Sequence, residues 1–358
     1  MKEGGERPSS WRSSFSTVLA IGAGVVLTLL VAGTEEYAKI AAWGTDLLFR
    51  ARPAVQTDDV VIVDINDDDV TDVLRGTPSV SRDELGALLR RILAAGPRVV
   101  GVLIDGSVPD LPSLRAELRD EKVVWGTRVW WREREKKFVM RSKGPPAVSV
   151  GPAVLWEDRD GVTRTFARSL PASTGMIPSF STVLLNAGGA RSLDEGSGAT
   201  CRRLIDFSLG PGHGSPFPVL SARWILDRPP GSGSDKIFSG AYVLVGEDYG
   251  DAVEYRTSIG PLSVAQTWAQ VIYGELRGAT VCRPGEGLML LWALVDGLLL
   301  TLLFSWAKFW PSIGIGILLS LALAAVVSVR IYGDLGHVTY FLPMLILMLV
   351  NRIRRALG

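Results

Sequence analysis

Acidic and amide side chains close two apolar runs of the chain, in a pattern that could bind a ligand. Asp64 and Asn66 lie at the end of the first run, and Asp105 ends the next apolar run along the chain. In doubly wound sheets, ligands bind beyond the carboxyl ends of the strands. We expect the two runs to be neighbouring strands, so that Asp64, Asn66 and Asp105 rim a small-molecule or cation site. Arg82, which lies between the two runs in the sequence, could supply a counter-charge.

The same residues also have a structural interpretation. Residues 67–69 could cap a following helix, while Asp64 and Asp105 form hydrogen bonds with nearby loops. The stretch begins like a calcium-binding EF-hand loop, but Asp69 occupies the position that requires glycine, and Arg75 occupies the position of the bidentate glutamate. An EF-hand is therefore excluded, and the ligand-binding and structural interpretations both stay open.

Residues suited to catalysis are scarce. The chain has 2 histidines, His213 in a Gly- and Pro-rich loop and His337 near the C-terminus, and no segment resembles a nucleophile elbow. Zinc is unsupported because the 2 cysteines are far apart and have no accompanying histidine pairs. We therefore expect a protein that is not an enzyme and that has no cofactor and no resident metal. A periplasmic metal-dependent hydrolase that uses Asp64 and Asp105 is the least favoured function.

Short β-rich apolar runs alternate with helical patterns in residues 34–284. This alternation predicts an α/β domain whose sheet, mixed or doubly wound, has flanking helices. Ser81 is a candidate N-cap for the first helix, and Gly96 followed by Pro97 would end it. The predicted strands are residues 60–65, 98–104, 122–125, 129–131, 204–207 and 241–245, and the predicted helices are residues 81–95 and 264–276.

Four apolar segments predict four transmembrane α-helices, because each is near the ~20 residues that cross a bilayer, although the last is short and would need flanking residues to cross. The distribution of Lys and Arg places both termini in the cytoplasm and the main domain in the periplasm, in a multi-pass protein of the cytoplasmic (inner) membrane. A cleaved signal peptide is the rival interpretation of the first segment. The predicted layout is a cytoplasmic tail at 1–15, membrane helices at 16–33, 285–304, 312–329 and 338–350, the extracytoplasmic domain at 34–284, a cytoplasmic loop at 305–311, an extracytoplasmic loop at 330–337 and a cytoplasmic tail at 351–358.

Asp296 lies near the middle of the second apolar segment. An isolated ionised carboxylate at that depth would cost ~2.5 to 3.5 kcal/mol on insertion scales. A neutral hydrogen bond to a helix neighbour such as Thr28 or Ser320 would lower this cost. The alternative is a transmembrane partner contact, in which Asp296 pairs with a Lys or Arg on a helix of another protein.

The exported region contains Cys201 and Cys282, and a disulfide can persist in that environment. A bridge across a loop of this length would stabilise the fold by ~4 to 5 kcal/mol in the chain-entropy model. A disulfide and two free thiols both remain possible from the sequence. The net charge of +1, the 47% of hydrophobic residues and the mean hydropathy of +0.25 fit a mixed membrane and globular chain without a basic surface for nucleic acid.

A series of short signals extends across nearly the whole exported region. Their order and spacing resemble the CHASE2 domain, an extracytoplasmic sensory module of bacterial receptors. Residues 77–80, the segment after Asp105, and Gln266 in place of a histidine common in the last helix depart from the family pattern. The matching signals are Asp46, Arg50 and residues 52–53, then residues 61–65, 81–82, 95–101 with Asp105, 158–162 with Arg164, 178–180, 238–240 and 242–246.

The resemblance implies a sensor. Family members commonly carry a cytoplasmic output domain, whereas the two predicted tails are far shorter than the ~50 residues of a domain. We therefore expect a membrane-anchored sensor subunit that binds an unknown ligand or envelope cue and passes a conformational change through its helices to a separate output protein. The chain could also form a homo-oligomer. The alternative is a structural or scaffolding subunit of a membrane assembly.

Overall fold

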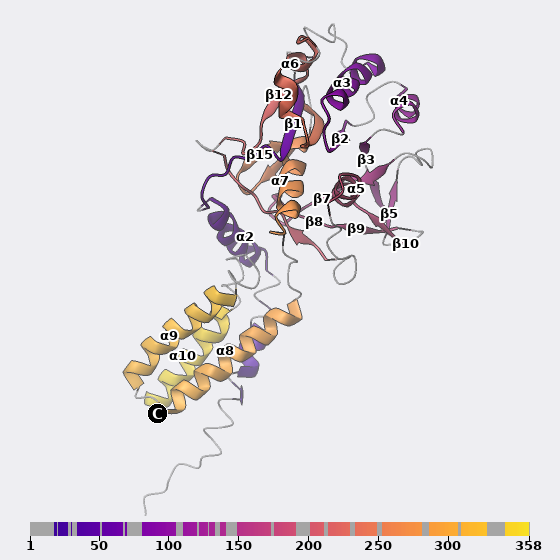
Figure 1. Ribbon diagram of the computed structural model, residues 1–358. Helices are drawn as coiled ribbons and strands as arrows, with labels where there is room; N and C mark the ends of the chain where they lie inside the picture. The colour runs from indigo at the N-terminus through magenta and orange to yellow at the C-terminus, as the bar shows by residue number, and fades with distance from the viewer. Residues whose placement is uncertain are drawn as a thin grey trace, which may run out of the picture. The chain divides into compact units, whose positions relative to one another are not determined.

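The computed structural model divides into two units, which are shown as ribbons in Figure 1. One unit is Phe49–Cys282, and the other combines Met1–Leu48 with Arg283–Gly358. The structure describes residues 18–19, 21–27, 30, 34–50, 52–66, 69, 81–104, 110–119, 122–127, 129–132, 137–140, 149–172, 175–190, 201–210, 214–229, 233–248, 253–280, 286–306, 309–327 and 341–357.

A parallel sheet forms the centre of the Phe49–Cys282 unit. Every neighbouring pair of its strands is parallel. Their near-continuous runs of Val, Ile and Leu are typical of strands that are covered on both faces. The 6 strands follow the order β12-β1-β13-β2-β3-β6, with β1 at Val60–Asn66, β2 at Val99–Leu103, β3 at Val123–Thr127, β6 at Val150–Pro152, β12 at Val219–Ser221 and β13 at Tyr242–Asp248.

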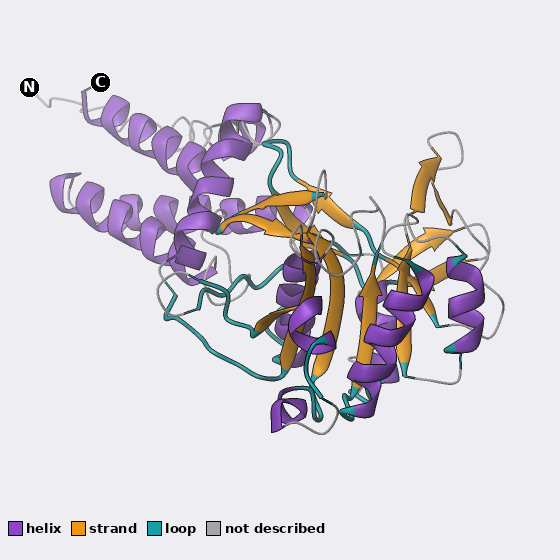
Figure 2. Ribbon diagram, turned by 90° about the horizontal axis from the view of Figure 1, so that it is seen from above, coloured by secondary structure: helices purple, strands orange, loops and turns teal. Residues whose placement is uncertain are grey.

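Helices cover both faces of this sheet, which confirms the predicted α/β domain with flanking helices (Figure 2). Of the two sheet types that the sequence left open, the structure has the doubly wound one. Side chains alternate along a strand, so Val61 and Val63 of β1 pack on one side while Val60 and Ile62 pack on the other. The first face carries α3 (Arg82–Ala94), α4 (Leu111–Glu117) and α6 (Ala222–Leu226), and the second carries α5 (Phe180–Ala187) and α7 (Val264–Leu276).

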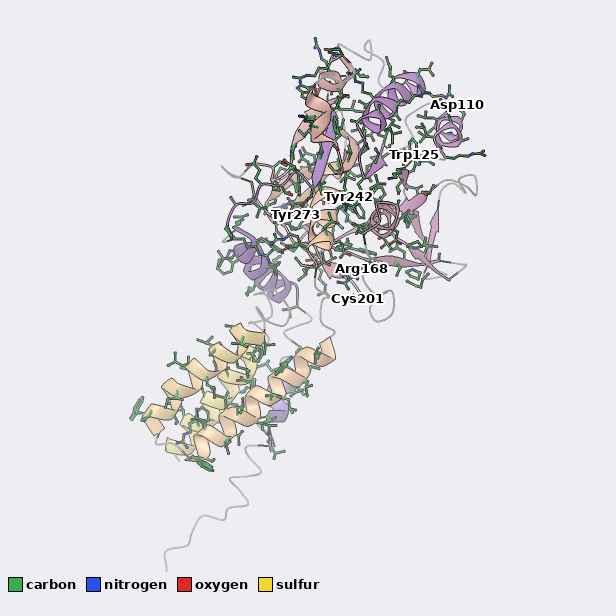
Figure 3. All side chains as sticks on the ribbon, in the orientation of Figure 1. Asp110, Trp125, Arg168, Cys201, Tyr242 and Tyr273 are labelled. Atoms are coloured by element: carbon green, nitrogen blue, oxygen red, sulfur yellow. The ribbon has the colours of Figure 1, made fainter. Side chains whose placement is uncertain are left out.

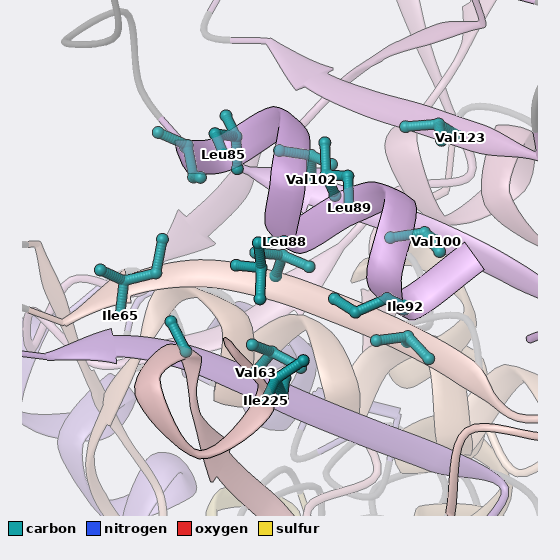
Figure 4. Packing of buried hydrophobic residues seen from close by; sticks show 14 of the residues in the cluster. Val63, Ile65, Leu85, Leu88, Leu89, Ile92, Val100, Val102, Val123 and Ile225 are labelled. Atoms are coloured by element: carbon teal, nitrogen blue, oxygen red, sulfur yellow. The ribbon is translucent and has the colours of Figure 1, made fainter. Parts of the chain in front are cut away.

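Helix α3 illustrates how local sequence signals set an element. Ser81 is its N-cap, and a capping box with Glu84 satisfies backbone N–H groups at the helix start. Gly96, with φ of 73°, takes up the left-handed conformation after the helix. Figure 4 shows its apolar side chains directed at the sheet, namely Leu85, Leu88, Leu89 and Ile92 against Val63, Ile65, Val100 and Val102.

Two smaller sheets complete this unit, and the sequence predicted few of their strands. Each of these strands has only 2 to 4 residues, too few to display the period-two alternation that identifies a strand. One sheet has the order β10-β9-β5-β4, with β4 at Val129–Arg132, β5 at Lys137–Met140, β9 at Ser169–Ala172 and β10 at Gly175–Pro178. The other has the order β11-β8-β14-β15 with β7 on β8, where β7 is Leu155–Glu157, β8 Thr163–Phe166, β11 Arg203–Leu204, β14 Glu254–Thr257 and β15 Gly260–Ser263. A 3-10 helix, η4, is Gly233–Ile237.

The other unit is helical. It contains α8 (Glu286–Trp306), α9 (Phe309–Val326) and α10 (Leu342–Leu357), together with most of α2 (Glu35–Arg50). Helix α8 packs against both α9 and α10. Its core includes Leu300, Phe304, Met344, Leu345 and Met348.

The prediction of four transmembrane α-helices is wrong. Within the described parts of the chain, no helix combines the length and the apolar character that a membrane crossing requires. The physical reason is that an apolar run of sequence and a helix need not share their limits. Helix α10, for example, has 16 residues and its C-terminal part contains Arg352 and Arg354, whereas a crossing needs ~20 consecutive, mostly apolar residues. The multi-pass membrane localisation depended on these spans and is not confirmed.

Candidate functional site

The carboxyl end of the parallel sheet gathers polar side chains beneath α7. In register, Asp64 of β1 pairs with Gly246 of β13, and Asn66 pairs with Asp248. Side chains alternate between the two faces along a strand, and Asp64, Asn66 and Asp248 occupy the positions whose other side chains pack against α7. They therefore lie on the α7 face of the sheet. We call the group formed by Asp64, Asn66, Asp248 and Gln266 of α7 the Asp64 edge.

The strand order corrects one expectation about this site. The strands that lead to Asp64 and Asp105 are not neighbours, because β13 lies between β1 and β2. Strand β13 therefore brings Asp248, rather than Asp105, next to Asn66. Asp105 itself lies outside the described residues.

The first turn of α7 closes over the strand ends. Ser263 is the N-cap, and Gln266 completes a capping box, with the Ser263 N–H donating to Gln266 Oε1 at 3.4 Å. The other end of the same amide, Nε2, donates to Asp64 Oδ2 at 3.5 Å. The close approach depends on Gly246, because a Cβ at that position would lie 2.6 Å from the Cβ of Ala265. Gln266 thus links the start of α7 to the end of β1.

Asp64 has an incomplete hydrogen-bonding environment. The residue is 5% exposed, and its buried Oδ1 has no hydrogen-bond partner among the described residues. Burial raises the pKa of the Asp64 carboxyl to about 7, and the negative charges of Asp248 and Asp69 add to the increase while the Gln266 hydrogen bond opposes it. A buried acid in this state can exchange a proton, or accept a hydrogen bond or a positive charge, near neutral pH.

Asp69, by contrast, has a structural role. Its carboxylate accepts hydrogen bonds from the N–H groups of Ala222 and Arg223 at the start of α6, at 3.2 and 3.0 Å. It also accepts from the Asn66 N–H at 3.0 Å, and the Asp69 N–H donates to Asn66 Oδ1 at 2.9 Å. The capping interpretation therefore holds for Asp69, although the capped helix is far along the chain instead of the next one.

Arg82 does not lie at this site. It stands at the start of α3, on the opposite face of the sheet from α7. Its guanidinium lies 3.0 Å from Glu117 Oε2, 3.4 Å from Asp83 Oδ1 and 3.8 Å from Asp110 Oδ2. The predicted counter-charge to Asp64 is therefore not supplied by Arg82.

Two further buried polar contacts fix the rest of α7, and the sequence did not single them out. The Gln270 side chain makes two hydrogen bonds to the backbone of Ser208, accepting from its N–H at 3.0 Å and donating to its carbonyl at 2.8 Å. Near the end of α7, Glu275 accepts from Arg168 Nε at 2.6 Å and from the hydroxyl of Thr280. Figure 3 labels Arg168 beside this part of the unit. The signal in the sequence was Gln270 and Glu275 among the apolar residues of the second half of this helix.

The remaining candidate residues lie elsewhere in the chain. Cys201 is disulfide-bonded, and the chain's other cysteine, Cys282, lies outside the described residues. Asp296 of α8 is 0% exposed, and its Oδ2 accepts a hydrogen bond from Ser320 of α9 at 2.7 Å. Ser320 is one of the neutral neighbours named from the sequence, while Thr28 lies outside the described residues. A contact between Asp296 and a basic residue of another protein stays a prediction.

The chemistry of the Asp64 edge is that of an acceptor-rich, negatively charged site. The charged groups that act on Asp64 are the carboxylates of Asp248 and Asp69. Over the described residues, no group of three or more His, Cys, Asp or Glu side chains is arranged to hold a metal ion.

A family model described as the CHASE2 domain matches residues 21–310 of the chain. No curated protein and no solved structure matches.

Proposed function

We propose a sensory function for this chain, which belongs to the CHASE2 domain family of extracytoplasmic sensory domains. A ligand binds at the Asp64 edge, and α7 carries the resulting conformational change across the domain toward a separate output protein. The single observation that carries this proposal is the state of the buried Asp64 carboxylate. Its Oδ1 has no partner among the described residues, and its Oδ2 contacts Gln266 in the first turn of α7.

A comparison within the same fold supports a functional role for Asp64. Asp69 accepts three backbone hydrogen bonds, as a structural carboxylate does. Asp64 has only the long contact with Gln266, and its Oδ1 has no partner among the described residues. A buried polar group without a partner costs ~1 to 3 kcal/mol or more, and such groups call for an explanation in native structures. Ligand binding would supply the missing partner.

Helix α7 is suited to transmit the change. It has 13 residues and therefore extends over roughly 20 Å at 1.5 Å per residue. Polar contacts anchor it at its start, middle and end, through Gln266, Gln270 and Glu275. A rigid helix with discrete contacts at both ends can couple two sites if the contacts have alternative arrangements. A change at Asp64 would then alter the contacts of Glu275 with Arg168 and Thr280.

Hydrogen exchange of the full chain tests this coupling. The wild type, Asp64→Asn and the control Asp58→Asn are compared at pH 8, where the Asp64 carboxyl is mostly ionised because its pKa is about 7. Asp58 is an exposed acid just before the amino end of the same strand, so its substitution changes the charge without touching the Asp64 edge. We expect Asp64→Asn to change amide protection both at residues 263–267 and at residues 275–280, while Asp58→Asn leaves both unchanged.

Two results would contradict the proposal. If the difference is confined to residues around Asp64, α7 does not transmit. If Asp64→Asn and Asp58→Asn give the same exchange pattern throughout, Asp64 is not linked to α7.

A further inference from the structure

We infer that the Asp64 edge binds the protonated amino group of a small organic amine. This inference rests on the proposed function and names the chemical class of its ligand. Three observations support it: the buried Asp64 oxygen without a hydrogen-bond partner, the negative charge of the neighbouring carboxylates, and the lack of a metal-binding cluster among the described residues.

The buried atom of the edge that lacks a hydrogen-bond partner among the described residues is an acceptor, Asp64 Oδ1. From these residues, Oδ2 receives only the 3.5 Å contact from Gln266. The N–H groups of Ser263 and Gln266, at the start of α7, are already used in the capping box. A ligand that satisfies this edge must therefore donate hydrogen bonds. An ammonium group donates three and accepts none.

The negative charges around Asp64 favour a positively charged ligand. Asp248 of β13 and the carboxylate of Asp69 both act on Asp64 with negative charge, and the side chain that reaches Asp64 from α7 is the neutral amide of Gln266. An anionic ligand would add a further negative charge to a buried carboxylate, which is costly, whereas a cation would neutralise it.

A metal ion fits the edge less well than an ammonium group. Calcium takes six to eight oxygen ligands, magnesium requires a near-octahedral shell, and zinc prefers Cys and His. The described residues contain no cluster of three or more side chains able to hold such an ion. Two carboxylates, from Asp64 and Asp248, suffice for an ammonium group.

A proton alone would leave the edge unsatisfied. Protonation of Asp64 at Oδ1 removes the buried negative charge but turns that oxygen into a donor, and the described residues place no acceptor against it. An amine supplies both the positive charge and the hydrogen bond. The charge and the geometry therefore point to the same ligand class.

Thermal unfolding of the full chain at pH 8 tests the ligand class. The probes are methylammonium, ethanolamine and putrescine chlorides, matched in concentration against tetramethylammonium chloride, which has the same charge but no N–H donor. Potassium chloride, magnesium chloride and sodium acetate control for ionic strength, a metal and an anion. We expect the three primary amines to raise the Tm of the wild type and of Asp58→Asn more than every control salt does. This increase should be lost in Asp64→Asn and reduced in Asp248→Asn.

A second measurement does not depend on a variant. The affinity of the wild type for methylammonium, measured by calorimetry, should fall about tenfold between pH 8 and pH 6. The reason is that Asp64, with a pKa of about 7, becomes mostly protonated over this range, while alkyl ammonium groups stay charged. An affinity that is the same at both values of pH would contradict ammonium binding to the Asp64 carboxylate.

The outcomes separate this inference from the function on which it rests. Equal stabilisation by tetramethylammonium, a larger effect of magnesium or acetate, or no effect of any primary amine would overturn the ammonium assignment. If the hydrogen-exchange coupling of Asp64 to α7 is nevertheless observed, the sensory proposal stands and only the ligand class is wrong. If that coupling is also absent, the proposed function fails with it.

Discussion

The side-chain amide of Gln266 donates to Asp64 Oδ2, 202 residues earlier in the chain, while it accepts from the N-cap of its own helix. One amide thus joins the end of β1 to the first turn of α7. Any change in the charge or position of Asp64 must alter a contact on which the start of α7 depends.

Ionisation of Asp64 should destabilise the folded protein. Its pKa is raised in the fold from 3.8 to about 7, chiefly by burial. The folded state therefore binds this proton more tightly than the unfolded state does. Protonated Asp64 thus adds to the free energy of unfolding at acidic pH, and this gain is lost as the pH rises from about 4 through 7. Between pH 5 and pH 8 the loss should be about 2 to 3 kcal/mol.

Denaturant unfolding of the wild type and of Asp64→Asn at a series of pH values checks this. The difference between the two free energies of unfolding should grow toward pH 8 in favour of Asp64→Asn. The control Asp58→Asn should follow the wild type. Parallel profiles for the wild type and Asp64→Asn would show that Asp64 titrates at an ordinary pKa.

The substitution Gly246→Ala should disturb the seat of α7 on the sheet. Its Cβ would lie 2.6 Å from the Cβ of Ala265, so β13 or the first turn of α7 must move. Overpacking of this kind costs about 1 to 3 kcal/mol. The matched control is Gly314→Ala in α9, where a Cβ would meet nothing within 4 Å. Equal free energies of unfolding for both variants would mean that the contact with Ala265 relaxes freely.

Removal of the charge at Glu275 should weaken the far end of α7. Glu275 is 3% exposed and its carboxylate pairs with Arg168, so Glu275→Gln removes the negative charge from a largely buried ion pair. Breaking a buried pair costs about 3 to 5 kcal/mol of stability. Because Arg168 is partly exposed, we expect a loss of about 3 kcal/mol. In the exposed pair of Arg223 with Asp227, the change Asp227→Asn should cost about 0.5 kcal/mol or less. Chemical denaturation compares the two, and similar losses would contradict a structural role for the Glu275 pair.

The hydrogen bond between Ser320 and Asp296 should stabilise the helical unit. Ser320→Ala removes the donor and leaves the buried Asp296 side chain with no described partner, at a cost of about 1 to 3 kcal/mol. Asp296→Asn keeps an oxygen that can accept from Ser320, so it should unfold close to the wild type. Thermal unfolding of both variants measures this. If Asp296→Asn is instead the more destabilised of the two, the carboxylate charge itself is needed within the unit.

The sequence alone determined the elements whose signals are local. The apolar run at residues 60–65 became β1, the Ser81 capping box and the leucine spacing gave α3, and residues 264–276 formed α7 as predicted. Buried runs and capping side chains act over a few residues, so they can be identified without knowledge of the fold. The family resemblance, built from the order of such signals, was confirmed by the match over residues 21–310.

Only the tertiary structure decided which side chains meet at the site. The order of the strands places β13 between β1 and β2, so Asp248 joins Asn66, while α3 carries Arg82 to the opposite face. Hydropathy likewise predicted membrane spans that the described helices do not support. Local composition fixes which elements form, because it depends on neighbours in the chain. The pairing of Asp64 with Gln266 depends instead on sheet order and helix placement, which long-range packing sets.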